Sequence, residues 1–494
     1  MAKEAKKVQL DAKGYRKFGM LDKVAYAAGD FGCNMSFSLK GTVQTFWLVF
    51  MMMETGLLSG LLLLVQIWDA VNDPMIGSMI DADRRKYKLG KFKTYILIGA
   101  IGLVVAGALV FIPVPNAPVV VKAILFVLGY LVWDACYTVA NVPYGSMLSL
   151  VTEDPGERAQ LSTWRSVGSM VGNMLPGMIL PMIIWKNVVD ENGKPVINPE
   201  TGKQVQELLG ERVFIAALLM GVLGFVAFLF MIKKITIRVD ENSVKTNETV
   251  KFNVIEAFKN FMKNRPAVGA TLCAMGMFLG MNSAATATQI MFAIYFGKAE
   301  LSGIVQMIGF VPMFFFMPFI KKIVAKWGKK EASVAGTIAS LIGGALMFVF
   351  PLIPNTNVAL VVYMVALVIF GLGMGVYTCV SWALMADAID YNEWKTGKRE
   401  EGTVYSLHSF FRKLAQGVGP SIVLLIMGAV GYNDKLKVGE QSAATAANMC
   451  WLVAALYLFS AVVQFIGIAV VYNLDKKTME KMNTELAARH QAEQ

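Results

Sequence analysis

Apolar runs of about 20 residues recur along the whole chain, and this recurrence constrains the fold more than any other feature. Each run is long enough to cross a hydrocarbon core of about 30 Å as a helix. Inside lipid every backbone N–H and C=O must be paired within the protein, which favours helices. Only 16% of the residues are charged and 56% are hydrophobic, whereas soluble domains average about 25% charged. The sequence therefore predicts an all-α membrane protein rather than a soluble protein with a large core.

The apolar runs predict twelve transmembrane helices, and their loops predict an orientation. Lys and Arg gather in the two terminal segments and in every second loop, which places both termini in the cytoplasm. One outward loop, residues 186–212, is long, and its "ENGKP" and "ETGK" turns predict a small external hairpin. The expected spans are residues 24–51, 56–82, 94–113, 118–149, 162–186, 211–233, 267–297, 300–320, 332–352, 358–387, 402–431 and 446–473.

The two halves of the sequence resemble each other. "RRKYKLGKFK" after the second span is similar to "KKIVAKWGKK" after the eighth, and "EDPGERAQLST" is similar to "GKREEGTVYS". Both pairs lie about 240 residues apart, which favours a 6+6 duplication of the major facilitator type. The expected parts are a cytosolic tail at 1–23, six-helix bundles at 24–233 and 267–473, a cytosolic loop at 234–266 and a cytosolic tail at 474–494.

The net charge of +11 is explained by basic residues in the cytoplasmic loops, so we do not expect nucleic-acid binding. The five cysteines lie in apolar runs without a CxxC pair, which argues against a disulfide framework or a zinc site.

Ionisable side chains inside predicted spans are expensive in lipid and usually mark an ion or substrate path. Asp69 and Asp73 are four residues apart and therefore share one helix face, with Asn72 beside them. Their oxygens predict a site for a monovalent cation or a shared proton. The alternative is that Asp73 forms a structural salt bridge. The ionisable residues in the spans are Asp30, Lys40, Asp69, Asp73, Asp134, Arg165, His408, Arg412 and Lys413.

A second group of polar side chains suits a sugar. Asn34 offers an amide with donor and acceptor roles, and Arg165 offers a planar fork of donors for hydroxyls or a carboxylate. Trp164 would stack on a sugar or pack in the bundle. The segment "YTVANVPYGSM" places Thr138, Asn141 and Tyr144 at helical spacing.

These motifs together resemble the glycoside–pentoside–hexuronide:cation symporter family of the major facilitator superfamily, typified by the melibiose permease. The resemblance spans nearly the whole chain. It is carried by "YAAGDFGCN", "IWDAVNDP", "GKFKTYILIG", "YTVANVPYGS", "ERAQLSTWR", "MADAIDYNEWKTGKREEG" and "VYSLHSFFRK".

The resemblance implies roles for individual positions. Asp69, Asn72 and Asp73, completed by Thr138, resemble the family's cation site. Arg165 resembles the arginine that contacts the sugar, and Lys413 resembles a lysine close to both sites; His408, in the same motif, would pack or contact substrate. The residues implied in a cytoplasmic charge network that holds the halves together are Arg84, Arg158, Asp387, Asp390, Arg399 and Glu401.

The chain departs from the melibiose branch at the expected sugar site. Two aspartates and a tryptophan of that branch are replaced by Asn34, Asn141 and Gly145. Lys40 adds a third cation to Arg165 and Lys413, which favours an anionic glycoside such as a glucuronide. The alternative is that Lys40 pairs with Asp69, Asp73 or Asp134, and that the substrate is a neutral pentoside or glucoside.

The expected function is cation-coupled glycoside symport by alternating access, driven by Na⁺, H⁺ or Li⁺ and needing no cofactor or other metal. We expect a monomer in a bacterial-type inner membrane. A lysolipid carrier of the same fold is a less favoured alternative, and a non-transporting sensor less favoured still. An enzyme is not expected, since no nucleophile–base pair appears and the second histidine, His490, lies in the terminal segment.

Overall fold

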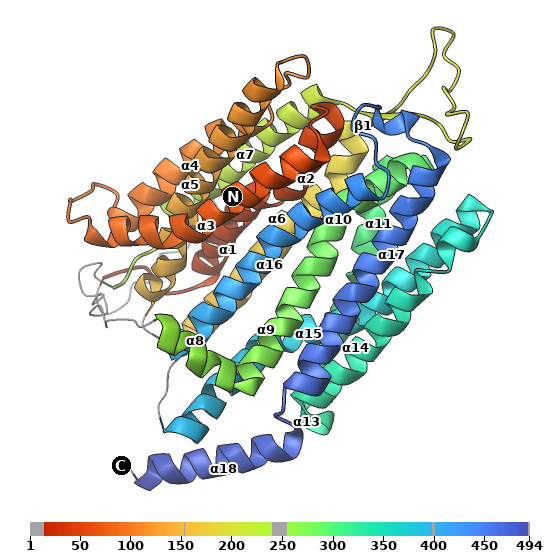
Figure 1. Cartoon of the computed structure of the whole chain (residues 1–494). Coiled ribbons are helices and arrows are strands. Elements are labelled where there is room, and N and C mark those ends of the chain that lie inside the picture. The colour runs from red at the N-terminus through yellow and green to blue at the C-terminus, as the bar shows by residue number, and fades with distance from the viewer. Residues whose placement is uncertain (1–13, 153, 240–253, 398–400, 493–494) are drawn as a thin grey trace, which may run out of the picture. The chain divides into compact units, whose positions relative to one another are not determined.

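The computed structural model describes residues 14–152, 154–239, 254–397 and 401–492, and helices dominate it (Figure 1). Within these ranges, the side chains of a few helical residues, including Asp73 and Glu401, lie outside the described set. The first half contains α1 (Met20–Phe37), α2 (Lys40–Thr45), a π-helical turn (Phe46–Phe50), α3 (Thr55–Ala82), α4 (Lys91–Val110), α5 (Val119–Val151), α6 (Pro155–Ile184) and α7 (Gly210–Lys234).

The second half is also helical, with more interruptions. Its helices are α8 (Val254–Lys263), α9 (Arg265–Met277), α10 (Ser283–Met291), α11 (Ser302–Ile308), α12 (Val311–Phe316), α13 (Ile320–Trp327), α14 (Lys329–Leu346), α15 (Thr356–Thr396), α16 (Glu401–Ala429), α17 (Ala443–Phe465) and α18 (Lys476–Ala492). Short π-helical segments at Phe278–Asn282, Phe292–Phe296 and Ile466–Val471 continue α9, α10 and α17.

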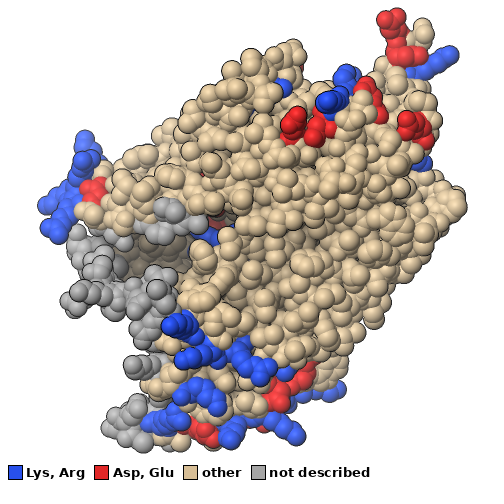
Figure 2. All heavy atoms as spheres, in the orientation of Figure 1, with Lys and Arg blue, Asp and Glu red and all other residues tan. Residues whose placement is uncertain are grey.

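Ten helical stretches among the described residues are long and apolar enough to cross a membrane. The two other expected spans are helical but less regular. The 24–51 run is divided into α1, α2 and the π-helical turn, and in α3 the apolar stretch covers Thr55–Asp69. On the face shown in Figure 2, charged side chains gather at helix ends and leave wide uncharged surfaces between them. The predicted all-α membrane fold is confirmed.

The chain divides into two compact units. The first contains Met1–Met51, Ile67–Leu180 and Leu209–Glu248; the second contains Met52–Gln66, Pro181–Leu208 and Thr249–Gln494. The outer part of α3 thus groups with the second unit. There Ser59 Oγ donates a hydrogen bond to the Ser421 carbonyl at 2.8 Å.

The first unit depends on close approach between helices, because lipid offers no hydrophobic driving force for their association. Gly168 on α6 faces the backbone of α1, and a Cβ built there would overlap the Ala27 carbonyl oxygen. This glycine lies three residues after Arg165, so it permits α6 to come close to α1 near Arg165.

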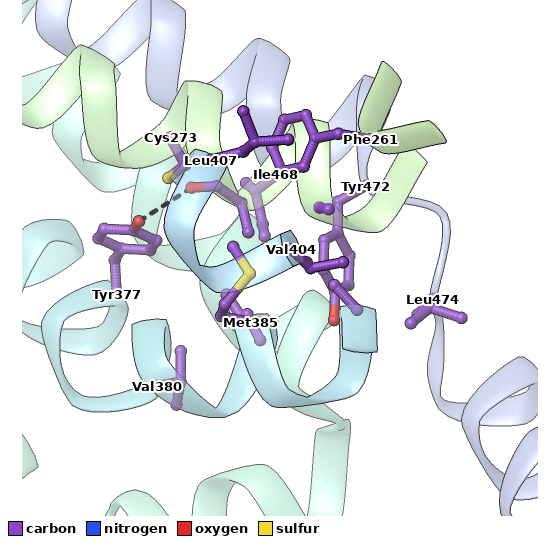
Figure 3. Packing of buried hydrophobic residues seen from close by; sticks show 14 of the residues in the cluster. Phe261, Cys273, Tyr377, Val380, Met385, Val404, Leu407, Ile468, Tyr472 and Leu474 are labelled. Atoms are coloured by element: carbon purple, nitrogen blue, oxygen red, sulfur yellow. Dashed lines mark hydrogen bonds between the residues drawn. The ribbon is translucent and has the colours of Figure 1, made fainter. Parts of the chain in front are cut away.

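The second unit packs α9, α15, α16, α18 and the π-helical segment Ile466–Val471 around a buried apolar cluster (Figure 3). Cys273, Tyr377, Met385 and Ile468 belong to it. The Tyr377 hydroxyl donates to the Ala270 carbonyl at 3.3 Å, the dashed bond in Figure 3, which satisfies this buried hydroxyl.

The predicted hairpin between the fifth and sixth spans is confirmed. Strands β1 (Trp185–Asn187) and β2 (Gln206–Leu208) pair antiparallel. Beyond the strands, Asn198 Nδ2 donates to the carbonyls of Gly439 and Gln441 at 2.8 and 3.1 Å. These bonds hold the hairpin against its own unit, in agreement with the assignment of residues 181–208 to the second unit.

Candidate functional site

A buried polar cluster joins α3 to α5 in the first unit. Asn72 is fully buried, and its Nδ2 donates to Asp134 Oδ2 at 3.3 Å and to Thr138 Oγ1 at 3.1 Å. The structure therefore brings together Asn72 and Thr138, as the sequence predicts. It adds Asp134, which sequence reasoning noted as ionisable without giving it a place in the cation site.

Lys40 lies beside the same cluster. Its Nζ is 3.6 Å from Asp69 Oδ2 and 3.8 Å from Asp134 Oδ1. Lys40 is the first residue of α2, after the break that follows α1 at Phe37, and its Nζ lies 5.1 Å from the centre of the Phe37 ring. Of the two interpretations of Lys40, pairing with acidic residues is the arrangement that the structure shows.

Asp73 lies one helical turn after Asp69 in α3, but its side chain is outside the described residues. The four-residue spacing in one helix still places the two positions on the same face.

A second polar cluster joins α1 to α6. Arg165 Nε donates to Asp30 Oδ1 at 3.2 Å. Asn34 Nδ2 donates to the Asp30 carbonyl at 2.8 Å, and Asn173 Nδ2 donates to Asn34 Oδ1. Arg165 keeps 36% of its side chain exposed, whereas that of Asp30 is 8% exposed, so the guanidinium is the accessible member of the pair. A fork of donors held by a buried carboxylate can bind sugar hydroxyls or a carboxylate.

Asn173 is a member of this cluster that sequence reasoning missed. It lies eight residues after Arg165, and therefore on the same face of α6. That spacing was the available signal, but an asparagine in an apolar run attracts less notice than a charge.

Tyr144 is packed rather than exposed. Its ring stacks on Tyr26 at 4.7 Å between centroids, and its hydroxyl donates to the Tyr26 carbonyl at 2.8 Å. The Arg165 guanidinium lies 5.1 Å from the Tyr144 ring centre. Tyr144 thus packs its ring against the Arg165 guanidinium. Asn141 on α5 and Trp164 on α6 are half-buried.

The two substrate candidates of α16 lie in the second unit. His408 is buried, with Nδ1 2.8 Å from Thr271 Oγ1 on α9. Lys413 is half-buried on the same helix. The neighbouring Arg412 places its guanidinium 5.7 Å from the Phe278 ring centre.

Of the predicted cytoplasmic charge network, Arg158 and Asp387 have defined partners within their own units. Arg158 Nε donates to the Thr152 carbonyl at 2.8 Å. Lys329 Nζ donates to both carboxylate oxygens of Asp387 at 2.6 and 2.8 Å.

The remaining members of that network are Arg84, Asp390, Arg399 and Glu401. Arg84 is exposed in the loop after α3, and Asp390 is half-buried on α15. Arg399 and the side chain of Glu401 lie outside the described residues.

The loop after α3 is fixed by one carboxylate. Asp83 Oδ2 accepts hydrogen bonds from the hydroxyls of Tyr87 at 2.5 Å and Tyr95 at 2.6 Å, and Asp83 Oδ1 accepts one from the Arg85 N–H at 2.9 Å. These donors, Tyr87 foremost, favour the ionised form and lower the pKa of Asp83 from 3.8 to about 2.

Removing the tyrosine donors should change the acid stability of the protein. The folded-state pKa of Asp83 is depressed, so its stabilising effect is present above pH 4 and is lost as the pH falls toward 2. Between pH 4 and pH 2 we expect the Tm of the double variant Tyr87→Phe/Tyr95→Phe to fall less than the Tm of the wild type. The measurement is Tm against pH, with Tyr405→Phe, a change at an exposed ring, as control. Identical profiles for the double variant and the wild type would contradict the assignment.

Comparison of the sequence with known proteins identifies a family. The family described as MFS/sugar transport protein matches residues 25–476. Among curated relatives, the uncharacterized symporter YnaJ of Bacillus subtilis is 30% identical, covering 97% of each chain. The glucuronide carrier protein homolog of Escherichia coli is 27% identical over 83% of each chain. The isoprimeverose transporter of Lactiplantibacillus pentosus is 27% identical over 96% of this chain and 92% of its own.

Solved structures agree on the fold. The crystal structure of a D-xylose-proton symporter superimposes on 90% of this chain and 96% of its own chain, with a TM-score of 0.57 and 14% sequence identity. The helical membrane fold, the "IWDAVNDP" motif of α3 and these matches point to one assignment. The chain belongs to the MFS/sugar transport family, as a glycoside–pentoside–hexuronide symporter of the major facilitator superfamily.

Proposed function

We propose that this protein is a cation-coupled glycoside symporter that works by alternating access. The observation that supports the proposal best is the pair of polar clusters in one unit. Asp69, Asn72, Asp134 and Thr138 form an oxygen-rich cluster, and Arg165, Asp30 and Asn34 form a hydrogen-bonding cluster. The first suits a monovalent cation and the second suits a sugar.

The two clusters lie on different helices, but neighbouring residues connect them, which offers a route for coupling. Lys40, beside the first cluster, begins α2, which follows α1 with Asn34. Helix α5 carries both Thr138 and Tyr144, whose ring packs against the Arg165 guanidinium. A cation that orders the α3–α5 cluster would therefore also order the helices that present the sugar cluster. By linkage, sugar must then raise the cation's affinity by the same factor.

The driving force comes from the ion gradient and the membrane potential. One charge moved through 100 mV contributes about 2.3 kcal/mol, and about 1.4 kcal/mol corresponds to tenfold. One cation per neutral sugar thus supports more than tenfold accumulation. With an anionic sugar the two charges cancel, and the ion gradient alone drives uptake. We propose Na⁺ or H⁺ as the coupling ion, with Li⁺ as a further alternative, since the same oxygens can serve each.

The cytoplasmic network is proposed to break and re-form when the two bundles, residues 24–233 and 267–473, rock. We also propose Asp73 as a ligand of the coupling cation, and His408 and Lys413 as substrate-binding residues. Arg158 and Asp387 are held by local bonds at cytoplasmic helix ends, which positions them for exchange of partners. We place the protein as a monomer in a bacterial-type inner membrane with both termini in the cytoplasm.

For the substrate, the first candidate is an anionic glycoside such as a glucuronide. It is supported by the exposed Arg165 fork and by a relative named as a glucuronide carrier homolog. The second candidate is a neutral pentoside or glucoside. It is favoured by the pairing of Lys40 with Asp69 and Asp134 and of Arg165 with Asp30, which offsets the positive charge, and by the isoprimeverose relative.

The test compares uptake of phenyl β-D-glucuronide and phenyl β-D-glucoside by proteoliposomes. For an anionic substrate we expect at least tenfold faster uptake of the glucuronide. We also expect that Arg165→Gln lowers affinity for the glucuronide more than for the glucoside. The control is Lys186→Gln, a change at an exposed lysine of β1. Equal uptake of both sugars would remove the anionic candidate. Absence of uptake for these two sugars and for every other sugar in a wider panel would remove the proposed function.

A further inference from the structure

Three charged side chains from three helices meet in the first unit. Lys40 begins α2, Asp69 lies in α3 and Asp134 lies in α5. The Lys40 ammonium lies between the two carboxylates, 3.6 Å from one and 3.8 Å from the other. Charge-assisted hydrogen bonds are shorter, about 2.7–2.9 Å. The ammonium therefore offsets the negative charge without closing a hydrogen bond to either acid.

Two oxygens of this cluster are left without hydrogen-bond donors. Asn72 Oδ1 and Asp134 Oδ1 are fully buried and have no hydrogen-bond partner among the described residues. The residues themselves are 0% and 1% exposed. Buried acceptors are normally satisfied, and an exception points to a water or an ion. A hard cation takes such carboxylate and amide oxygens as ligands.

We propose that Asp134 is a ligand of the coupling cation together with Asp69 and Asn72, and that Lys40 is a tethered counter-ion that competes with the cation for this position. This inference rests on the proposed symport function, and it gives Asp134 the role of a direct ligand and Lys40 the role of a competitor. The ammonium neutralises the carboxylates while the cation is absent, and the cation binds when the ammonium withdraws. Lys40 thus sets the affinity for the cation.

The position of Lys40 permits such a withdrawal. The residue follows directly on the break between α1 and α2, and its side chain is 23% exposed. A lysine stem is flexible and its ammonium is a point charge, so it can move without a fixed geometry. The Phe37 and Tyr130 rings, with centres 5.1 and 5.9 Å from Nζ, offer a cation a second favourable surface.

The exchange is also balanced in charge. A cation entering as the ammonium leaves keeps the charge beside Asp69 and Asp134 unchanged. Both cations together would repel each other at close range, so occupation by one weakens occupation by the other. Removing the ammonium should therefore strengthen cation binding, whereas a purely structural Lys40 would leave it unchanged or weaken it.

The test is the half-saturating concentration of Na⁺, and separately of Li⁺, for raising the Tm of the purified protein, with choline keeping the ionic strength constant. We expect Lys40→Met to lower this concentration at least tenfold, or to create a response where the wild type has none. Lys40→Arg should stay near the wild type. Asp134→Asn should raise the concentration at least tenfold, and Lys186→Met is the matched control for loss of an exposed lysine.

An unchanged or higher concentration in Lys40→Met, or no response to either ion in wild type and variant, would overturn the inference. If Lys40→Met fails to fold, Asp134→Asn decides, because an unchanged concentration there is equally contradictory. Failure of the proposed function is a different result: glycoside uptake that no ion gradient drives, or no glycoside uptake.

Discussion

Asp69→Asn is expected to lower sugar accumulation at least hundredfold while leaving sugar counterflow measurable. A carboxylate about 4 Å from a bound cation contributes about 4 kcal/mol at an effective dielectric constant of about 20. Loss of that attraction corresponds to more than hundredfold weaker cation binding. The Arg165 cluster does not include Asp69, so sugar should still bind and exchange.

The readout is radiolabelled sugar in proteoliposomes, measured as gradient-driven uptake and as counterflow without a gradient. Glu207→Gln, the same chemical change at an exposed residue of β2, is the control and should leave both unchanged. Wild-type accumulation by Asp69→Asn would place the ion elsewhere. Equal loss of uptake and counterflow would show that the residue serves the fold or the sugar site instead.

Gly168→Ala is expected to weaken sugar binding at least tenfold and to lower the Tm. The added methyl group would overlap the Ala27 carbonyl oxygen, a backbone atom that cannot rotate away. Overpacking of this kind costs about 1–3 kcal/mol. Pushing α6 away from α1 would also draw Arg165 away from Asp30. Arg165 Nε and Asp30 Oδ1 lie 3.2 Å apart.

Gly60→Ala is the matched control for this substitution. A Cβ at Gly60 meets nothing within 4 Å, and alanine is the better helix former. The measurements are Tm and the sugar concentration for half-maximal counterflow. Normal sugar binding in Gly168→Ala would show that the α1–α6 contact does not position the sugar cluster.

The sequence predicted the fold well because lipid makes helix formation nearly obligatory in a long apolar run. The 118–149 run appears as α5, Val119–Val151, and the 402–431 run as α16, Glu401–Ala429. The break between α1 and α2 was not predicted, since hydropathy averages over a window and does not detect two residues of irregular backbone. That break places Lys40.

The candidate site was predicted by position but not by partner. Helical spacing suffices to place Asn72 near Asp69, and the resemblance added Thr138. The choice of partner for Lys40 depends on where α2 and α5 lie in space, which no local pattern specifies. The same holds for Asp30 with Arg165, 135 residues apart, and for the Tyr26–Tyr144 stack.

Gradient-driven uptake of a glycoside panel by proteoliposomes, with Na⁺ and H⁺ gradients imposed separately, tests the central claim most directly. The account predicts that at least one glycoside accumulates more than tenfold over equilibrium under one of these gradients. It also predicts that Asp69→Asn loses this accumulation. Equilibration of every sugar to the same level with and without a gradient would contradict it.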